Sequence, residues 1–163
     1  MKKFERNKKE KGFALLEILI ALVVITISFL AGVSFLFFAR QASSKAIQKT
    51  EAVSLAEEAL EAVRNLRDES WSGNIEALAA GTTYYPTLSA GKWTLSTTNP
   101  SSSSTYTTTV VFSLVNRDAS ANISAVGSND PNTRKIVASV SWKEANTTET
   151  VALTAYVTNF LGN

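Results

Sequence analysis

Phe13–Phe38 read FALLEILIALVVITISFLAGVSFLFF, an apolar run with a single carboxylate, Glu17. As an α-helix, an apolar run longer than about 18 residues can cross the roughly 30 Å hydrocarbon layer of a bilayer. Met1–Gly12, the segment before it, carries six lysine and arginine side chains against two glutamates, and lysine-rich flanks stay in the cytoplasm. The sequence therefore predicts a transmembrane helix with the N-terminus inside and the rest of the chain outside.

Glu17 is a residue that a simple membrane anchor does not need. A carboxylate inside a spanning helix costs on the order of a few kcal/mol, so an intramembrane ionisable residue is first treated as functional. The alternative is that Glu17 lies near enough to the cytoplasmic headgroups to stay hydrated. The apolar run alone leaves both interpretations open.

The residues around Glu17 form a recognisable motif. Lys11-Gly12-Phe13 ends a short basic leader, glutamate is the fifth residue after Gly12, and an uninterrupted apolar run follows. This combination closely resembles the N-terminal motif of type IV prepilins and type II secretion pseudopilins. The resemblance implies cleavage between Gly12 and Phe13 by a prepilin peptidase on the cytoplasmic face, N-methylation of the new Phe13 amine, and assembly into a filament.

Cleavage after Gly12 would also give Glu17 a role. The new amine at Phe13 is four residues before Glu17, and residues four apart share one face of a helix. In a low-dielectric filament core, the amine of an entering subunit and the Glu17 carboxylate of a neighbour attract strongly, and an unpaired charge is costly. We therefore expect Glu17 to set the axial register of assembly.

Composition limits the functional classes. With one membrane segment, the 163-residue chain leaves about 120 residues outside, enough for one small domain. Loss of the leader, with its six basic and two acidic side chains, changes the formal net charge from +2 to −2 before the termini are counted. The chain has no cysteine or histidine, so disulfides, thiolate metal sites and histidine chemistry are excluded. We expect no enzyme activity, no cofactor and no metal.

The helix is expected to continue beyond the membrane. Residues 40–66 are rich in alanine, glutamate, glutamine and lysine and contain no proline or glycine, which favours helix. Apolar residues at three- and four-residue steps predict a stripe buried against a sheet: Ala46, Ile47, Val53, Ala56, Leu60, Val63 and Leu66. Gly32 and Ser34 leave two interpretations open, a local loosening of the helix or close packing between helices.

The second half of the chain has a β pattern. A loop over residues 68–81, with a helical turn near residues 75–80, is expected to be anchored by Trp71. Strands are predicted at residues 84–85, 93–95, 105–115, 134–142 and 150–159, with Pro86 and Gly91 separating the first two. Leu114 is expected on the same face as Val110 and Phe112. Residues 117–133 are expected to be an exposed loop with a turn at residues 129–132.

These elements predict an α+β, pilin-like fold, in which a long N-terminal helix packs on a small antiparallel β-sheet of about four strands. The last two strands form a hairpin through residues 144–148, and without a glycine this connection is not expected to be the tightest type. The predicted organisation is a leader at residues 1–12, a transmembrane and assembly helix at 13–39, and an exported domain at 40–163. Residues 99–104 are expected to form a flexible connection.

Three further residue groups each have a functional and an ordinary interpretation. Calcium ligands or a turn are the alternatives for Asp118, Asn129, Asp130 and Asn132. A DNA-binding surface or a solvated face are the alternatives for Lys92, Arg117, Arg134, Lys135 and Lys143. Glycan acceptors or a solvated loop are the alternatives for Thr97–Thr109 and the sequons at Asn122 and Asn146. In each group the pattern favours the ordinary interpretation.

The expected function is a structural filament subunit whose precursor lies in the cytoplasmic membrane and whose mature form lies in a cell-surface or periplasmic filament. Its expected partners are the prepilin peptidase, other pilin subunits, the pilus or secretion assembly machinery and the membrane, but not nucleic acid. One alternative is a minor adhesin or DNA-binding pilin that uses residues 97–133. Another is an uncleaved, signal-anchored surface domain. The sequence leaves pilus and secretion pseudopilus open.

Overall fold

The computed structural model describes residues 8–100, 105–144 and 146–162. Helix α1 runs without interruption from Lys8 to Glu69, three residues beyond its predicted end. The chain divides into two compact units, Met1–Ile47 and Gln48–Asn163, and α1 contributes to both. Leader residues 1–7 and residues 101–104 of the predicted connection lie outside the described residues.

In the first unit, α1 exposes its side chains along its length. From Phe13 to Ile47 every residue is exposed except Val33, which is half-buried. The helix is regular through Gly32, where an added Cβ would meet nothing within 4 Å, so the structure shows no loosening there. The Ser34 hydroxyl donates to the Leu30 carbonyl oxygen at 2.9 Å, which satisfies this polar group within the helix.

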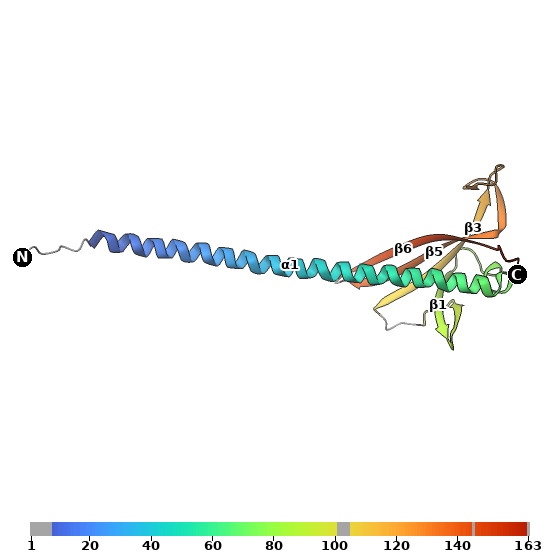
Figure 1. The fold of residues 1–163 in the computed structure, drawn as a ribbon, viewed down its shortest axis with the longest axis horizontal. Helices are drawn as coiled ribbons and strands as arrows, with labels where there is room; N and C mark the ends of the chain where they lie inside the picture. Colours follow the sequence, from blue (N-terminus) through green and yellow to red (C-terminus); the bar gives the residue numbers. More distant parts are fainter. Residues whose placement is uncertain (1–7, 101–104, 145, 163) are drawn as a thin grey trace, which may run out of the picture. The chain divides into compact units, whose positions relative to one another are not determined.

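The second unit contains an antiparallel sheet, which has six strands within the described residues and is larger than predicted. The strands are β1 (Thr83–Ser89), β2 (Lys92–Ser96), β3 (Tyr106–Arg117), β4 (Ile123–Ser124), β5 (Ser128–Glu144) and β6 (Thr147–Thr158). Their order in the sheet is β2-β1-β3-β5-β6, with β4 paired to the end of β3 (Figure 1).

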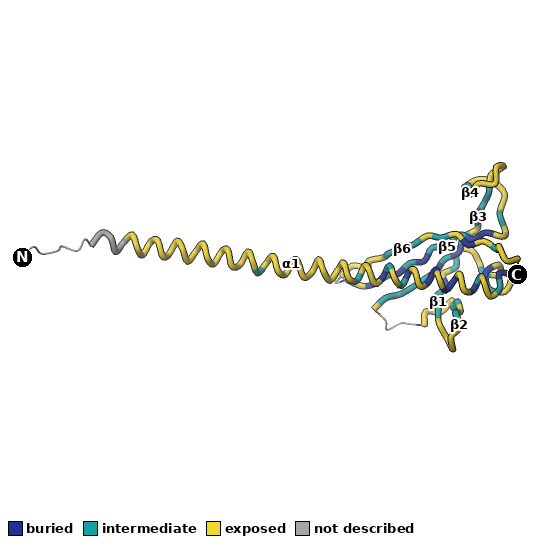
Figure 2. Tube along the Cα trace, in the orientation of Figure 1, coloured by how far each residue is buried: buried dark blue, intermediate teal, exposed yellow. Residues whose placement is uncertain are grey.

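The C-terminal part of α1 packs on one face of this sheet, which confirms the α+β, pilin-like arrangement. Val63 and Leu66 lie in one buried cluster with Phe112 and Ile136. A second cluster joins helix residues Ala52 and Ala56 to strand residues Val140 and Trp142. Figure 2 shows the buried residues along this part of α1 and along β5. Ala46 and Ile47 were wrongly predicted as core. Both are exposed, Ile47 by 65%, and the first core residue of α1 is Ala52.

The segment after α1 is held by buried side chains. Trp71 is buried, as predicted, and Ile75 is buried beside it in the same cluster. The helical turn predicted near residues 75–80 is a π-helical turn, η1, at Ser72–Glu76. The Tyr84 hydroxyl accepts the Ala79 N–H at 3.0 Å, which ties this segment to β1.

The sequence had suggested that Pro86 separates two strands, but Pro86 lies inside β1. β1 pairs with β3 only at Thr83 and Tyr84, so by Pro86 the strand is an edge on that side. Proline is tolerated at such an edge because it has no N–H to give to a ladder. The chain turns at Ala90-Gly91, both with positive φ, a conformation that tight β-hairpins require.

The turn predicted at residues 129–132 is instead an irregularity within β5. Leu114 pairs with Arg134 but Val115 pairs with Asp130, so three residues of β5 have no counterpart on β3. At this shift the expected burial is not found: Leu114, predicted on the face of Val110 and Phe112, is 54% exposed, whereas Val115 is only 3% exposed. Thr133, in a segment predicted to be exposed, is buried. Asn, Asp and Pro are typical turn residues, and a local pattern does not record that the partner strand continues opposite them, which explains the wrong prediction.

The β5–β6 hairpin is confirmed, and it is tighter than predicted. Glu144 pairs with Thr147 at its end. The Thr147 hydroxyl donates to the Glu144 carbonyl oxygen at 3.0 Å. This side-chain bond supports the turn where the sequence offers no glycine.

Candidate functional site

The residues of the predicted processing and assembly site all lie in α1. Gly12 falls within its bounds, Phe13 is 75% exposed, and Glu17 is exposed. Phe13 and Glu17 are four residues apart in a continuous helix, so they share a face. The helix therefore brings the backbone nitrogen of Phe13 and the Glu17 carboxylate to adjacent turns.

The surface around this site is apolar on every side of the helix. Between Phe13 and Phe38 the large apolar side chains, Val33 apart, are 47–75% exposed. Within the described residues, α1 is the helix long and apolar enough to cross a membrane. The Thr26 and Ser28 hydroxyls donate to carbonyl oxygens of the preceding turn, Leu22 at 2.6 Å and Val24 at 2.8 Å. Hydroxyl groups that are hydrogen-bonded within their own helix need no partner from water, which suits a helix surrounded by lipid or by other helices.

The acidic residues considered as calcium ligands bind their own loops. The Asp118 carboxylate accepts the backbone N–H groups of Ser120 and Asn122, each at 2.9 Å. The hydrogen bond from Asn122 is the largest cause of the lowered pKa of Asp118. Asn129, Asp130 and Asn132 lie in β5. Over the described ranges, no three acidic side chains gather in a position to hold a metal ion.

Asp130 lies at the centre of a local network beside the irregularity in β5. Its carboxylate accepts hydrogen bonds from the Thr133 hydroxyl and from Arg117 Nε, both at 2.6 Å. The Thr133 hydroxyl and the Arg117 guanidinium lower the pKa of Asp130, in that order of size. Arg117 also donates to the Ala121 carbonyl oxygen at 2.8 Å. The network fixes the loop between β3 and β5.

The cations considered for DNA binding do not form one surface. Lys92 in β2 forms an ion pair with Glu69 at 2.8 Å, and its hydrogen bond to Glu69 is the main cause of its raised pKa. Arg117 is paired with Asp130. Arg134 is buried and donates to the Pro131 and Thr133 carbonyl oxygens. Lys135 and Lys143, eight residues apart on β5, lie roughly 26 Å apart along the strand.

The candidate glycan acceptors lie in different parts of the domain. Thr97 and Thr98 come shortly before the undescribed residues 101–104, whereas Thr107–Thr109 belongs to β3. Asn122 precedes β4, Asn146 precedes β6, and both side chains are exposed.

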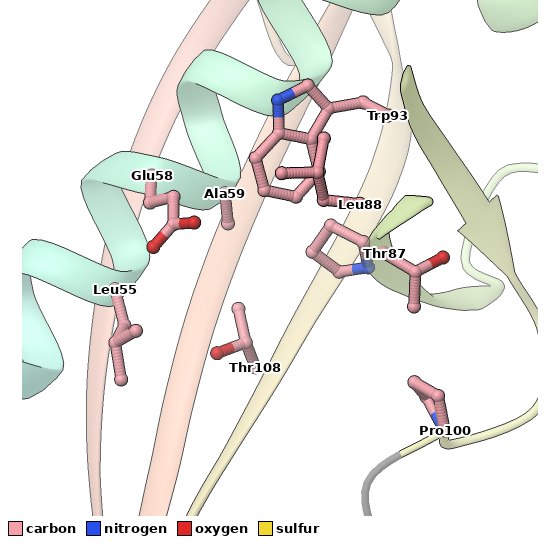
Figure 3. Close-up of a pocket in the computed structure, with 9 residues that line it drawn as sticks. Leu55, Glu58, Ala59, Thr87, Leu88, Trp93, Pro100 and Thr108 are labelled. Carbon is pink, nitrogen blue, oxygen red and sulfur yellow. The ribbon is translucent and has the colours of Figure 1, made fainter. Parts of the chain in front are cut away.

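Sequence reasoning missed a hollow between α1 and the β1–β2 hairpin. Its volume is about 370 Å³, and Leu55, Glu58, Pro86, Leu88 and Trp93 are among the residues that line it. Figure 3 shows Leu55 and Glu58 projecting from α1 on one side, with Leu88 and Trp93 on the other. Glu58 and Trp93 are 35 residues apart in the sequence. Only the packing of the hairpin beside the helix brings them together.

Comparison with known proteins identifies the N-terminal segment. Residues 7–33 match the family model described as the prokaryotic N-terminal methylation motif. Gly12, Phe13 and Glu17 all lie inside the matched segment. No curated protein and no solved structure gives a significant match to the chain.

Proposed function

We propose that this chain, which carries the prokaryotic N-terminal methylation motif typical of type IV pilins and pseudopilins, is a structural subunit of a type IV pilus or pseudopilus filament. Proteins of this pilin-like kind are generally non-enzymatic structural subunits. The observation that carries the proposal is the exposed apolar helix, Phe13–Phe38, directly after the cleavage position in the motif.

An apolar helix of this kind needs cover from outside its own chain. Each large apolar side chain contributes about 1.5–3 kcal/mol when it is fully buried, and exposed apolar patches of this size mark contact surfaces. In the precursor, lipid provides the cover, with residues 1–12 in the cytoplasm. In a filament, the same helices of neighbouring subunits provide it.

Processing supplies the chemistry of assembly. In the proposed sequence of events, a prepilin peptidase hydrolyses the Gly12–Phe13 bond, and the new Phe13 amine is then methylated and stays cationic. When a subunit leaves the membrane, its amine can lie beside the Glu17 carboxylate of the subunit already in place. In the low-dielectric core, a displacement of one helical turn leaves both charges unmatched. Glu17 thereby sets the axial register.

The proposal assigns each part of the chain a location. Residues 1–12 are removed, residues 13–39 pass from the cytoplasmic membrane into the filament core, and residues 40–163 form the exported domain on its outside. The peptidase, other pilin subunits and the assembly machinery are the partners. The ion pairs of Lys92 and Arg117 with acidic side chains favour this structural role over nucleic-acid binding.

Mass spectrometry of the N-terminus tests the proposal. In a host with a prepilin peptidase, we expect the full chain to yield a mature protein that begins at N-methylated Phe13. Gly12→Leu should block processing, because glycine leaves the scissile bond unobstructed. Gly32→Leu is the matched control, because the structure leaves open space at Gly32, and it should still be processed. Exported wild-type protein that keeps Lys2–Lys11 would contradict the proposal.

A further inference from the structure

Charge is segregated along α1 where the helix leaves its apolar run. The basic segment, Arg40–Lys49, contains three cations and no carboxylate. The acidic segment, Glu51–Glu61, follows directly and contains four glutamates and no cation. The cations of the basic segment and all four glutamates are exposed. One helix therefore presents two adjacent segments of opposite sign.

Two glutamates of the acidic segment already have partners within the chain. Glu61 forms an ion pair with Arg64, and Glu51 accepts a hydrogen bond from the Tyr106 hydroxyl at 3.0 Å. Burial, followed by this contact with Glu51, raises the pKa of Tyr106. Among the described residues, Glu57 and Glu58 have neither an ion pair nor a side-chain hydrogen bond. These two carboxylates remain available for a cation from outside.

Glu58 lies in a setting suited to a long cationic side chain. It borders the 370 Å³ hollow that Trp93 and Leu55 also line (Figure 3). Lysine and arginine bury their aliphatic stems on apolar surface and keep the charged end accessible. An indole ring attracts a cation placed over its face. An apolar wall, an indole and a carboxylate together match such a side chain.

Lys49, the cation of the basic segment nearest in sequence to Glu58, cannot supply that cation within its own chain. Lys49 and Glu58 are nine residues apart, which separates them by about 13 Å along the helix axis and by half a turn around it. The two side chains therefore point away from each other on a rigid helix. A second copy, shifted along the axis, brings its own basic segment beside this acidic segment without the same restriction.

We propose that the basic segment Arg40–Lys49 of one copy docks on the acidic segment of a neighbouring copy, with a cationic side chain in the hollow bordered by Glu58 and Trp93. The inference rests on the proposed filament function. It adds a second electrostatic contact between subunits, outside the apolar core and independent of Phe13 and Glu17. Because this contact is exposed to water, it weakens as salt shortens the screening length.

Charge reversal in the full-length chain tests the contact. Lys49→Glu and Glu58→Lys are each expected to lower the yield of sheared filaments about tenfold, because each places like charges together. The double variant exchanges the two charges and should restore the yield to within about twofold of wild type. Glu76→Lys, an equal charge change at an exposed residue of η1, should leave the yield unchanged.

Cysteine cross-linking locates the contact directly, because the natural chain contains no cysteine. In Lys49→Cys/Glu58→Cys, a disulfide within one helix is geometrically impossible at nine residues' separation. Oxidised filaments of this variant should give a ladder of dimers, trimers and higher multimers. The control Lys49→Cys/Glu76→Cys should give no ladder.

The outcomes separate the two proposals. Processed filaments that are insensitive to both reversals and give no ladder would overturn the docking contact and leave the filament function standing. Disulfides only to a different protein would overturn the choice of a second copy as the occupant. Processed protein that forms no filaments at all, even as wild type, would overturn both.

Discussion

The two units of this chain meet their packing requirements in opposite ways. In the unit from Gln48 onward, the core residues of α1 between Ala52 and Leu66 are at most 8% exposed, and the sheet of the same chain covers them. Between Phe13 and Phe38 the same helix is apolar on all sides and exposed (Figure 2). A helix with an apolar stripe on one side can bury it against one sheet. A helix that is apolar all round must be surrounded by lipid or by other helices to bury its surface. We therefore expect the first unit to depend on molecules outside the chain for the burial of its apolar side chains.

The largest expected effect comes from a charge placed in the self-contained unit. Val63 is fully buried against the sheet, so Val63→Asp should destabilise the domain by about 3–5 kcal/mol through an unpaired buried charge. Urea unfolding of the full chain in detergent, followed by tryptophan fluorescence, measures this change. Ile47→Asp is the matched control: at this exposed helix position the change should be about 0.5 kcal/mol or less. Equal losses of stability at both positions would contradict the conclusion that the buried core of α1 begins after Ile47.

A smaller effect on stability is expected from the network of Asp130, whose partners Arg117 and Thr133 belong to the same domain. Asp130→Asn removes the carboxylate that accepts from Arg117 and Thr133. We expect a loss of about 1 kcal/mol, since the pair is partly exposed to solvent. Unfolding measured at neutral pH checks this value, and an unchanged stability would contradict the role of the network.

The same network predicts a pH dependence. Because Thr133 and Arg117 hold the pKa of Asp130 below its ordinary value, the folded chain binds this proton less tightly than the unfolded chain. The contribution of Asp130 is therefore complete above about pH 4 and is lost as pH falls through the lowered pKa. The stability difference between wild type and Asp130→Asn should narrow in that acidic range.

The smallest effect on the stability of the domain is expected from removing residues 1–39. A chain shortened to residues 40–163 keeps every core residue of the second unit. It should fold as a soluble monomer with mixed helix and antiparallel strand, and its free energy of unfolding should match that of the full chain. Circular dichroism and sedimentation test this, and an unfolded shortened chain would refute the claim that the domain is self-contained.

Repetitive patterns were the features that sequence could predict. The apolar run, the helical stripe from Ala56 to Leu66 and the alternation of β5 and β6 all follow from one local period repeated several times. The motif around Gly12 and Glu17 is also local and could be read directly. These features were enough to predict the α+β fold and to single out the candidate processing residues.

The errors came from features that depend on contacts between distant segments. Leu114 is exposed and Val115 is buried at the point where the register between β3 and β5 shifts, and no local pattern in β3 records this. Ile47 continues the helical stripe in sequence, but its side chain is 65% exposed. The hollow at Glu58 and Trp93 was missed for the same reason, since it joins a helix to a hairpin that follows much later.

The most direct test of the account is the fate of Glu17→Val, the variant that removes the single carboxylate of the exposed helix without altering the proposed cleavage position. Its processing is measured by mass spectrometry and its incorporation by fractionation of sheared filaments, with Glu76→Val as the control outside the apolar helix. We predict normal membrane insertion and cleavage but poor incorporation, because the neighbour's Phe13 amine loses its counter-charge. Normal incorporation of the processed Glu17→Val protein would contradict the register role and return Glu17 to a hydrated, incidental residue.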